Sequence, residues 1–589
     1  MSRPRYAVGL DLGDGESAIA WVECADAGDV RLYDRGDDEV SVVTAMARGI
    51  EGTELLGEAA LLDPEVRHAR VNFKTRPRRT RVGLARSLDI VDFARLFVAE
   101  FGERHPEIIG GCRLYIGHPA GWDQATVAVY REQLEGALRP LPVQLVPESQ
   151  SAFLHVHDQA RVDPETRPVL VVDVGSSTID FTLVTDGPEN LPYGDELGCR
   201  RIDEEIRDVV LKREHDPAVR EHLAQPTAAG LLSWLCRRHK EAAFSGLAFQ
   251  PPPARPNSKL RWVIDTCWPA LARIDVEALV RRPGGWLDRF RDELRQVRGH
   301  LGERLPLIVL TAGGGARMPL VGQACAEVFA GATIDPVSEP SLAVARGLAS
   351  YGRWRLRVEA FRDAVRALTD STEIDDCVRA DARGFTRRLY AAYYQNQWEA
   401  IFEPILAEIG AGAPPREAVG DMKAQQRRLI SWLATPTARP VRDRVLGPLE
   451  DRINGVLRPA ADRLCAAHGL PSHALDTRVT LPPTIFLQPR AALLPVLPLL
   501  EKVSGPLMAG LARSRVFRAS LRGQLRILKS AGPVVSMTGA GNLYRLNDGD
   551  VAELTHAVRE EVAKQLLQRV RSIETLLAVE EPQAPSGGR

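Results

Sequence analysis

The sequence lacks a net charge of either sign. Its 76 lysine and arginine residues are balanced by 77 acidic residues, which leaves a formal charge of −1 at pH 7. Proteins that bind nucleic acid through its phosphates normally present a positive field. One short basic run occupies residues 76–81, and such a run is more typical of a solvated surface. We therefore expect no nucleic-acid partner.

The sequence also lacks paired cysteines. Its 8 cysteines are scattered, and none forms a Cys-x-x-Cys pair or a Cys/His ligand spacing. Neither a zinc site nor a disulfide framework is indicated. We expect free thiols, as in a reducing compartment.

Long apolar runs are missing as well. The longest uncharged one, residues 491–500, contains two prolines and is too short to cross a bilayer. The N-terminal residues lead directly into a strand interrupted by Asp11, without the apolar core of a signal peptide. These features predict a cytoplasmic protein.

Among the features that are present, two segments resemble copies of one structural unit. Residues 7–22 and residues 169–184 each combine an apolar run, an Asp-x-Gly turn and a second apolar run. Each predicts a buried strand, a tight glycine turn and a returning strand. The alignment places Asp11 on Asp173. A repeat over this separation predicts two similar lobes.

A third glycine turn has a different context. An apolar run at residues 307–310 leads into Gly313, Gly314 and Gly315, after which a helical pattern begins. Glycine lets backbone approach a flat or phosphorylated ligand, because it has no side chain to hold the ligand off. One such turn alone predicts only a tight turn. Three in order around a repeat indicate a ligand site.

The two aspartates suggest which ligand. Two carboxylates that face each other in a confined site repel unless a cation or proton lies between them. Magnesium that keeps its waters and bridges nucleotide phosphates meets that need, and the N–H groups of the glycine turns can hold phosphate oxygens. The alternative is a buried structural pair, Asp11 and Asp173, neutralised by arginine.

These motifs, in this order, resemble those of the superfamily that contains actin, heat-shock protein 70 and the sugar kinases. The matching segments are residues 10–13, 71–74, 116–122, 146–152, 172–180, 313–319 and 340–347. The resemblance covers about residues 5–352 and is nearest to the chaperone branch, mainly through Lys74, Glu148 and the proline-containing segment 116–122.

The resemblance implies an α/β fold. Residues 1–355 would form a two-lobed actin-like ATPase domain, which is a duplicated ribonuclease H-like fold. Lobe I would take about residues 1–165 plus 335–355, and lobe II about residues 166–334.

The resemblance also implies a role for each matched residue, with ATP and Mg²⁺ as cofactors. Asp11 and Asp173 would hold the hydrated metal. The residues implied to be catalytic are Lys74, Glu148, Asp173 and Thr178, of which Lys74 and Glu148 would place the attacking water and Thr178 would contact the γ-phosphate. The residues implied to bind nucleotide are Asp11, Gly13, Asp14, Gly15, Gly175, Ser176, Ser177, Lys240, Gly313, Gly314, Gly315 and Arg317. For Lys240, proposed to reach the ribose, the alternative is a solvated helix lysine.

The first turn departs from the chaperone pattern. Where the chaperones usually have two threonines, this chain has Asp14, Gly15 and then Glu16. Carboxylates beside phosphates are unfavourable unless they turn outward or bind the metal. This departure predicts impaired hydrolysis more than impaired binding.

Beyond about Tyr351, helical spacing replaces strand-like runs. We expect an all-α output domain over residues 356–578 and a disordered tail over residues 579–589. The β-sandwich peptide-binding domain of the chaperones has no counterpart. An unidentified protein client or regulator is the expected partner. A peripheral membrane contact is an alternative, because Arg513, Arg515, Arg518 and Arg522 follow the apolar segment 493–511.

The leading functional hypothesis is a slowly hydrolysing, heat-shock protein 70-like ATPase, chaperone-like or regulatory, whose lobe closure switches the helical domain. The alternatives are an actin-like filament-forming ATPase, a small-molecule kinase that would need a catalytic aspartate such as Asp180, and a nucleotide sensor without turnover.

Overall fold

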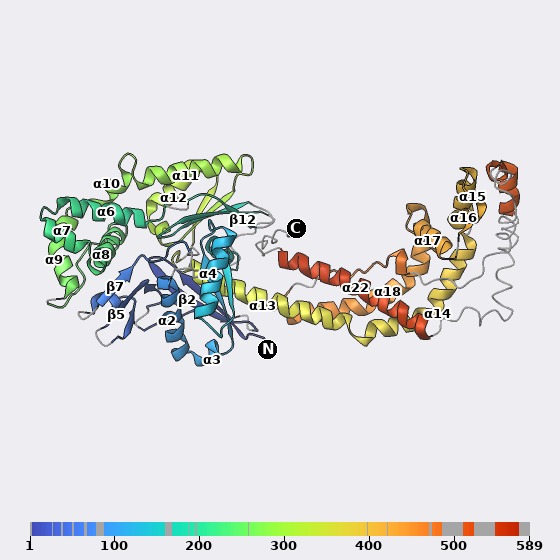
Figure 1. The fold of residues 1–589 in the computed structure, drawn as a ribbon, viewed down its shortest axis with the longest axis horizontal. Helices are drawn as coiled ribbons and strands as arrows, with labels where there is room; N and C mark the ends of the chain where they lie inside the picture. The colour runs from blue at the N-terminus through green and yellow to red at the C-terminus, as the bar shows by residue number, and fades with distance from the viewer. Residues whose placement is uncertain are drawn as a thin grey trace. The chain divides into compact units, whose positions relative to one another are not determined.

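The computed structural model describes most of residues 3–575. Outside the described residues lie 26–27, 37–38, 50–51, 64–66, 78–87, 159–167, 186–187, 195–196, 257, 338, 397, 421, 471–473, 486–509 and 524–547. The predicted tail at 579–589 and nearly all of the apolar segment 493–511 are therefore not described. The fold is mixed α/β, which confirms that part of the prediction (Figure 1).

The chain divides into two compact units. The first comprises Met1–Arg357 with Glu574–Arg589, and the second comprises Val358–Ile573. The boundary falls within a single helix, α13 (Ala343–Thr369).

The first unit contains two larger sheets that share one topology. In the first sheet, the order is β3-β2-β1-β8-β9, with β4 beside β2. Strand β1 pairs antiparallel with β2 and parallel with β8. The strands are β1 (Tyr6–Leu12), β2 (Glu16–Glu23), β3 (Arg31–Leu32), β4 (Val42–Val43), β8 (Cys112–His118) and β9 (Val143–Pro147).

The second sheet has the order β12-β11-β10-β13-β14. Strand β10 pairs antiparallel with β11 and parallel with β13, as β1 does with β2 and β8. Every residue of β10 is buried, as expected for a strand covered on both faces. The strands are β10 (Val169–Val174), β11 (Ile179–Val184), β12 (Pro188–Leu191), β13 (Ile308–Ala312) and β14 (Thr333–Pro336).

Two helices connect the sheets through a common apolar core. This core contains Ala7 of β1, Val171 of β10, Ala152 of helix α5 (Glu148–Asp158) and Leu348 of α13. A Cβ on Gly347 of α13 would overlap the backbone carbonyl of Ser151 in α5. The absence of a side chain there therefore lets the two helices pack closely.

A small third sheet packs against helix α8 (Pro226–Phe244). The sheet has the order β6-β5-β7, formed by β6 (Glu54–Leu56), β5 (Ala45–Arg48) and β7 (Arg67–Val71). Its Ala47 and Ala69 share an apolar core with Leu231 and Leu235 of α8. The other helical segments of this unit are α1 (Ala59–Leu62), α2 (Leu88–Arg104), α3 (Pro106–Ile109), α4 (Gln124–Ala137), α6 (Arg200–Arg213), α7 (Pro217–Leu223), α9 (Lys259–Leu271), α10 (Val276–Arg281), α11 (Trp286–Leu301), the 3₁₀ turn η1 (Gly314–Arg317) and α12 (Pro319–Val328).

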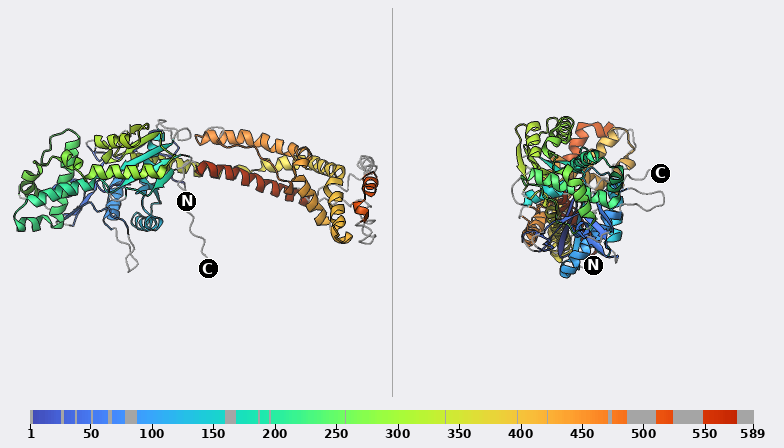
Figure 2. Two further views of the ribbon diagram at one scale, coloured as in Figure 1. Left: turned by 90° about the horizontal axis from the view of Figure 1, so that it is seen from above. Right: turned by 90° about the vertical axis from the view of Figure 1, so that its left-hand side faces the viewer.

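Where the second unit is described, its secondary structure is helical. Figure 2 shows its long helices, coloured yellow to red, running lengthwise side by side. The apolar stripe of α22 (Asp548–Thr575), which includes Leu554, Val558 and Val562, is fully buried in the core of this unit. The remaining segments are α14 (Thr372–Gln395), the π-helical η2 (Trp398–Phe402), α15 (Glu403–Gly410), α16 (Pro415–Val419), α17 (Met422–Leu433), η3 (Pro436–Ala438), α18 (Arg439–Ala467), η4 (Pro483–Ile485) and α22 (Asp548–Thr575). None of the described helices combines the length and apolar character that a membrane span requires.

Candidate functional site

One cavity of about 340 Å³ in the first unit gathers the residues that the sequence singled out. Its walls come from the β1–β2 turn, the β10–β11 turn, the turn after β13, and helix α8. Every residue assigned to catalysis or nucleotide binding in the sequence lines it, namely Asp11, Gly13, Asp14, Gly15, Lys74, Glu148, Asp173, Gly175, Ser176, Ser177, Thr178, Lys240, Gly313, Gly314, Gly315 and Arg317. The cavity thus brings the three glycine turns together.

Asp11 and Asp173 occupy equivalent places on their strands. Asp11 is the next-to-last residue of β1, and Asp173 is the next-to-last residue of β10. The parallel pairing of β10 with β13 sets Asp173 beside Ala312. Gly313 follows with a φ of 78°, and a Cβ there would overlap the Asp173 carboxylate. A residue other than glycine would therefore force the third turn away from Asp173.

Two carboxyl groups of the cavity, those of Asp11 and Asp173, have raised pKa values. Burial and the neighbouring Glu148 raise the pKa of Asp11 to about 7, although Lys74 opposes the shift. Burial, followed by the charges of Glu148, Asp180 and Asp11, raises the pKa of Asp173 well above its usual value. Such groups favour a bound proton or a cation.

The described residues contain no group of three or more histidine, cysteine or acidic side chains arranged to hold a metal ion. Magnesium usually keeps several waters and needs only one or two protein carboxylates. Asp11 and Asp173 fit a hydrated ion of this kind, since both carboxyl groups line the cavity and burial and neighbouring carboxylates raise their pKa values.

Lys74 and Glu148 form a buried ion pair at the edge of this cluster. The Lys74 Nζ lies 2.7 Å from the Glu148 Oε1, and the two side chains are 3% and 13% exposed. Burial lowers the pKa of Lys74, but the charge of Glu148 and those of further neighbours outweigh it, so the net shift is upward. Lys74 is therefore a fixed positive charge, and it holds a carboxylate that could orient a water molecule.

Asp14 is neither turned outward nor left open to a metal, the two arrangements considered from the sequence. Its carboxylate accepts hydrogen bonds from the Lys74 backbone N–H (3.2 Å), the Ser176 hydroxyl (3.4 Å) and the Arg200 Nη1 (3.1 Å). Its pKa is raised by burial, and the Arg200 charge opposes that shift. The Asp14 side chain therefore ties the β1–β2 turn, the first turn, to the β10–β11 turn, the second turn, and to α6.

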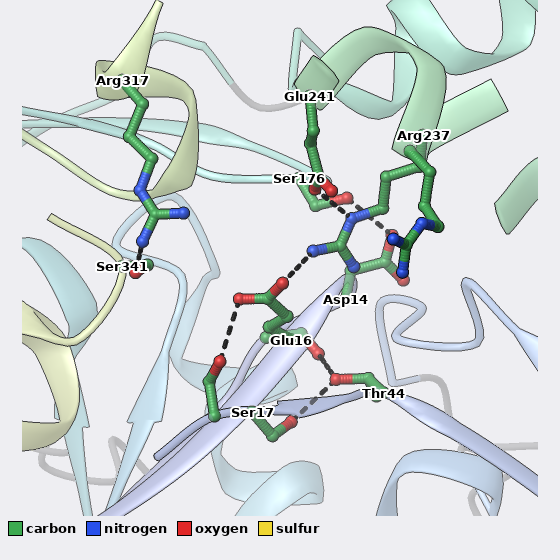
Figure 3. A network of polar contacts seen from close by, with 12 residues as sticks. Asp14, Glu16, Ser17, Thr44, Ser176, Arg237, Glu241, Arg317 and Ser341 are labelled. Atoms are coloured by element: carbon green, nitrogen blue, oxygen red, sulfur yellow. Dashed lines mark hydrogen bonds and ion pairs between the residues drawn. The ribbon is translucent and has the colours of Figure 1, made fainter. Parts of the chain in front are cut away.

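Glu16 is also paired with an arginine (Figure 3). The Arg237 Nη2 lies 2.6 Å from the Glu16 Oε1, and the Arg237 Nε lies 2.7 Å from the Glu241 Oε1. Figure 3 shows Arg237 reaching from its helix to a position between these two carboxylates. Glu16 also accepts a hydrogen bond from the Ser41 hydroxyl at 3.3 Å.

The Thr178 hydroxyl is directed at protein rather than into the cavity. It donates to the Asp180 Oδ2 at 2.9 Å. Asp180 also accepts the N–H groups of Ala120 (2.6 Å) and Gly121 (3.2 Å) and does not line the cavity. Asp180 is therefore poorly placed to be the catalytic base that a small-molecule kinase would need.

Lys240 is not the solvated lysine that was the alternative reading. Its ammonium group lies 2.9 Å from Asp203 and 3.3 Å from the Cys199 carbonyl oxygen, and the residue is buried. Lys240 also lines the cavity, and its contact with a ribose stays a prediction. Arg317 is exposed and donates to the Ser341 hydroxyl at 2.6 Å.

The sequence reasoning missed several residues of the cavity, including Arg237, Glu241 and Phe244. These lie on the same helix as Lys240. Positions three and four residues apart share a helix face. A helical spacing drawn from Lys240 would have found Arg237 and Phe244.

No protein-family model matches the chain, and a search of curated proteins found no significant match.

Proposed function

We propose that the first unit binds Mg²⁺–ATP in this cavity and hydrolyses it slowly, as a heat-shock protein 70-like ATPase. The single observation that carries the proposal is the meeting of three glycine turns around Asp11 and Asp173, which end equivalent strands. Backbone N–H groups in such turns hold phosphate oxygens.

The two sheets support the two-lobed, actin-like part of the proposal. They share strand order and pairing, and the first turn and the second turn follow corresponding strands. A duplicated fold of this kind would place both turns against one ligand. Helices α5 and α13 would connect the two lobes, since each packs in the core common to both sheets.

Each group of the cavity would have a separate task. Asp11 and Asp173 would hold magnesium through its waters, and the turns at Gly13, Gly175 and Gly313 would hold the nucleotide. The metal, when bound, supplies charge neutralisation for phosphoryl transfer. Glu148, held by Lys74, would orient the attacking water, because it lines the same cavity as both aspartates.

Slow turnover follows from groups that are already engaged. The Thr178 hydroxyl is bound to Asp180, and the Asp14 carboxylate is bound to Arg200. A side chain that must first break such a bond contributes less to the transition state. The same observation favours the second candidate, a nucleotide sensor that binds without turnover.

The second unit is proposed to be the output domain. Its described residues form a helical core of their own. We propose that it passes the nucleotide state to a protein client or regulator, rather than clamping an extended peptide in a β-sandwich.

Binding of Mg²⁺–ATP to the full chain tests the proposed function. Calorimetry should show saturable binding, and the melting temperature should rise as for any ligand selective for the native state. Asp173→Ala is the matched loss-of-site variant, and ATP with excess chelator is the metal control. An unchanged melting temperature and protease pattern in saturating Mg²⁺–ATP would show that the assignment is wrong.

A further inference from the structure

The first turn makes two ion pairs with arginines, Asp14–Arg200 and Glu16–Arg237, and the two carboxylates differ in burial. The Asp14 side chain is 0% exposed and has three donors, including Arg200. Glu16 is 31% exposed, whereas its partner Arg237 is 15% exposed. Glu16 can therefore exchange its partner for water at lower cost than Asp14, because desolvation is the main cost of leaving a charge unpaired.

Arg237 lies directly against the backbone of the first turn. A Cβ on Gly15 would stand 2.6 Å from the Arg237 Nη1, so the guanidinium occupies the space over that glycine. Both residues line the cavity. The Arg237 guanidinium thus lies on the cavity side of the first turn, which is proposed to hold phosphate.

Glu241 keeps Arg237 in this position. It lies four residues along the same helix, and its Oε1 accepts from the Arg237 Nε at 2.7 Å. Glu16 contacts a different nitrogen, Nη2. The guanidinium is therefore anchored from its own helix on one side, while the other side binds a carboxylate from the turn.

A guanidinium recognises carboxylates and phosphates with the same planar set of donors. Glu16 consequently occupies Arg237 in the way that a phosphate oxygen would. A phosphate that approached the first turn would meet an arginine that Glu16 already engages, together with the repelling charge of that carboxylate.

We propose that Arg237 is a phosphate-binding residue of the cavity and that Glu16 is an internal competitor for it. Glu16 must release Arg237 before the phosphate groups of a ligand bind against the first turn. This inference rests on the proposed function, because it assumes that the cavity takes a polyphosphate. Glu16 in the first turn would therefore reduce the affinity of the cavity for a polyphosphate ligand.

The test compares binding of two probes, Mg²⁺–ATP and inorganic triphosphate, by calorimetry at one fixed ionic strength. Glu16→Gln should tighten binding of both by about fivefold, the equivalent of losing one competing partly exposed ion pair. Arg237→Gln should weaken binding by about tenfold, as expected for loss of a charged hydrogen bond. In the Arg237→Gln background, Glu16→Gln should change affinity by less than about twofold, since the competition has been removed.

Glu58→Gln is the matched control. Glu58 lies 3.1 Å from Arg238, which is on helix α8 with Arg237. Glu58 does not line the cavity. The Glu58→Gln variant removes the same charge from the same kind of ion pair and should leave the affinity for both probes unchanged. Glu16→Asp is the second variant: it keeps the charge but shortens the side chain, so competition predicts tighter binding and simple repulsion does not.

The outcomes separate the inference from the function on which it rests. If the wild type binds Mg²⁺–ATP but Glu16→Gln binds it equally or more weakly, the competition is overturned and the ATP site stands. An undiminished effect of Glu16→Gln in the Arg237→Gln background also overturns it, because repulsion alone would then explain the gain. Failure of both probes to bind any variant overturns both ideas. Triphosphate binding that appears only in the Glu16 variants, while no variant binds Mg²⁺–ATP, supports the competition and counts against ATP as the ligand.

Discussion

The first and second turns of the cavity have the same framework and different chemistry. Each follows the inner strand of its sheet and lies beside a strand-end aspartate. The first turn carries the carboxylates of Asp14 and Glu16, and both are paired with arginines. The second carries the hydroxyls of Ser176 and Thr178, which contact Asp14 and Asp180. The repeated strands fix where a ligand would lie, whereas the turn side chains decide what charge it meets.

The largest contrast between the turns should come from their first glycines. A Cβ on Gly13 would overlap the Glu16 carbonyl oxygen, whereas a Cβ on Gly175 would lie 3.1 Å from the Thr178 oxygen. We expect Gly13→Ala to cost about 3 kcal/mol or more and Gly175→Ala about 1 kcal/mol, because only the first forces the backbone to move. Urea unfolding of both variants measures this difference. Equal costs, or the reverse order, would mean that the turns relax alike.

A second contrast separates the metal site from the water site. Asp173→Ala should lower magnesium-dependent ATP affinity by about tenfold or more, since coordination acts on both ground and transition states. Lys74→Ala should leave affinity within about threefold and lower turnover by about a hundredfold, since orientation of water matters chiefly at the transition state. Calorimetry and single-turnover phosphate release measure the two effects. Equal losses of affinity would argue against separate roles, and a wild type without turnover would favour the nucleotide sensor.

The sequence predicted which residues line the common cavity better than it predicted their contacts. Buried apolar runs ending in Asp-x-Gly identified both inner strands, because backbone geometry leaves few alternatives for such a pattern. The sequence could not show that Asp14 pairs with Arg200, since Arg200 begins helix α6, far along the chain from the first turn. The partner of Lys240 could not be predicted either, because Asp203 lies on another helix.

The stabilisation of the protein by Mg²⁺–ATP should depend on pH in a defined direction. The pKa of Asp11 is raised to about 7 in the folded protein, against about 3.9 for an unperturbed aspartate. Between these values the folded state holds more protons than the unfolded state, so the contribution of Asp11 to stability falls as pH rises from about 4 to 7. A cation bound to the carboxylate reverses that loss. We therefore expect Mg²⁺–ATP to raise the melting temperature more at pH 8 than at pH 5.5.

Asp11→Asn is the variant that assigns this pH dependence. It should reduce the difference between the two pH values without abolishing it, because the pKa values of Asp173 and Asp180 are also raised, each chiefly by burial. Melting curves with and without Mg²⁺–ATP at both pH values give the measurement. A difference between pH values that is unchanged in Asp11→Asn would assign the titration to the other carboxyls.

The smallest effect should come from the hydroxyl that joins the two turns. Ser176→Ala removes a 3.4 Å contact to Asp14 but leaves the Arg200 pair and the Lys74 N–H in place. We expect a loss of about 0.5 kcal/mol, at the low end for a hydrogen bond, because the contact is long and two donors remain. Arg200→Gln is the matched comparison and should cost about 2 kcal/mol, since it leaves a buried carboxylate short of its charged partner. Urea unfolding at pH 8 compares the two variants. If Ser176→Ala cost as much as Arg200→Gln, the hydroxyl and not the ion pair would be the main anchor of the Asp14 carboxylate.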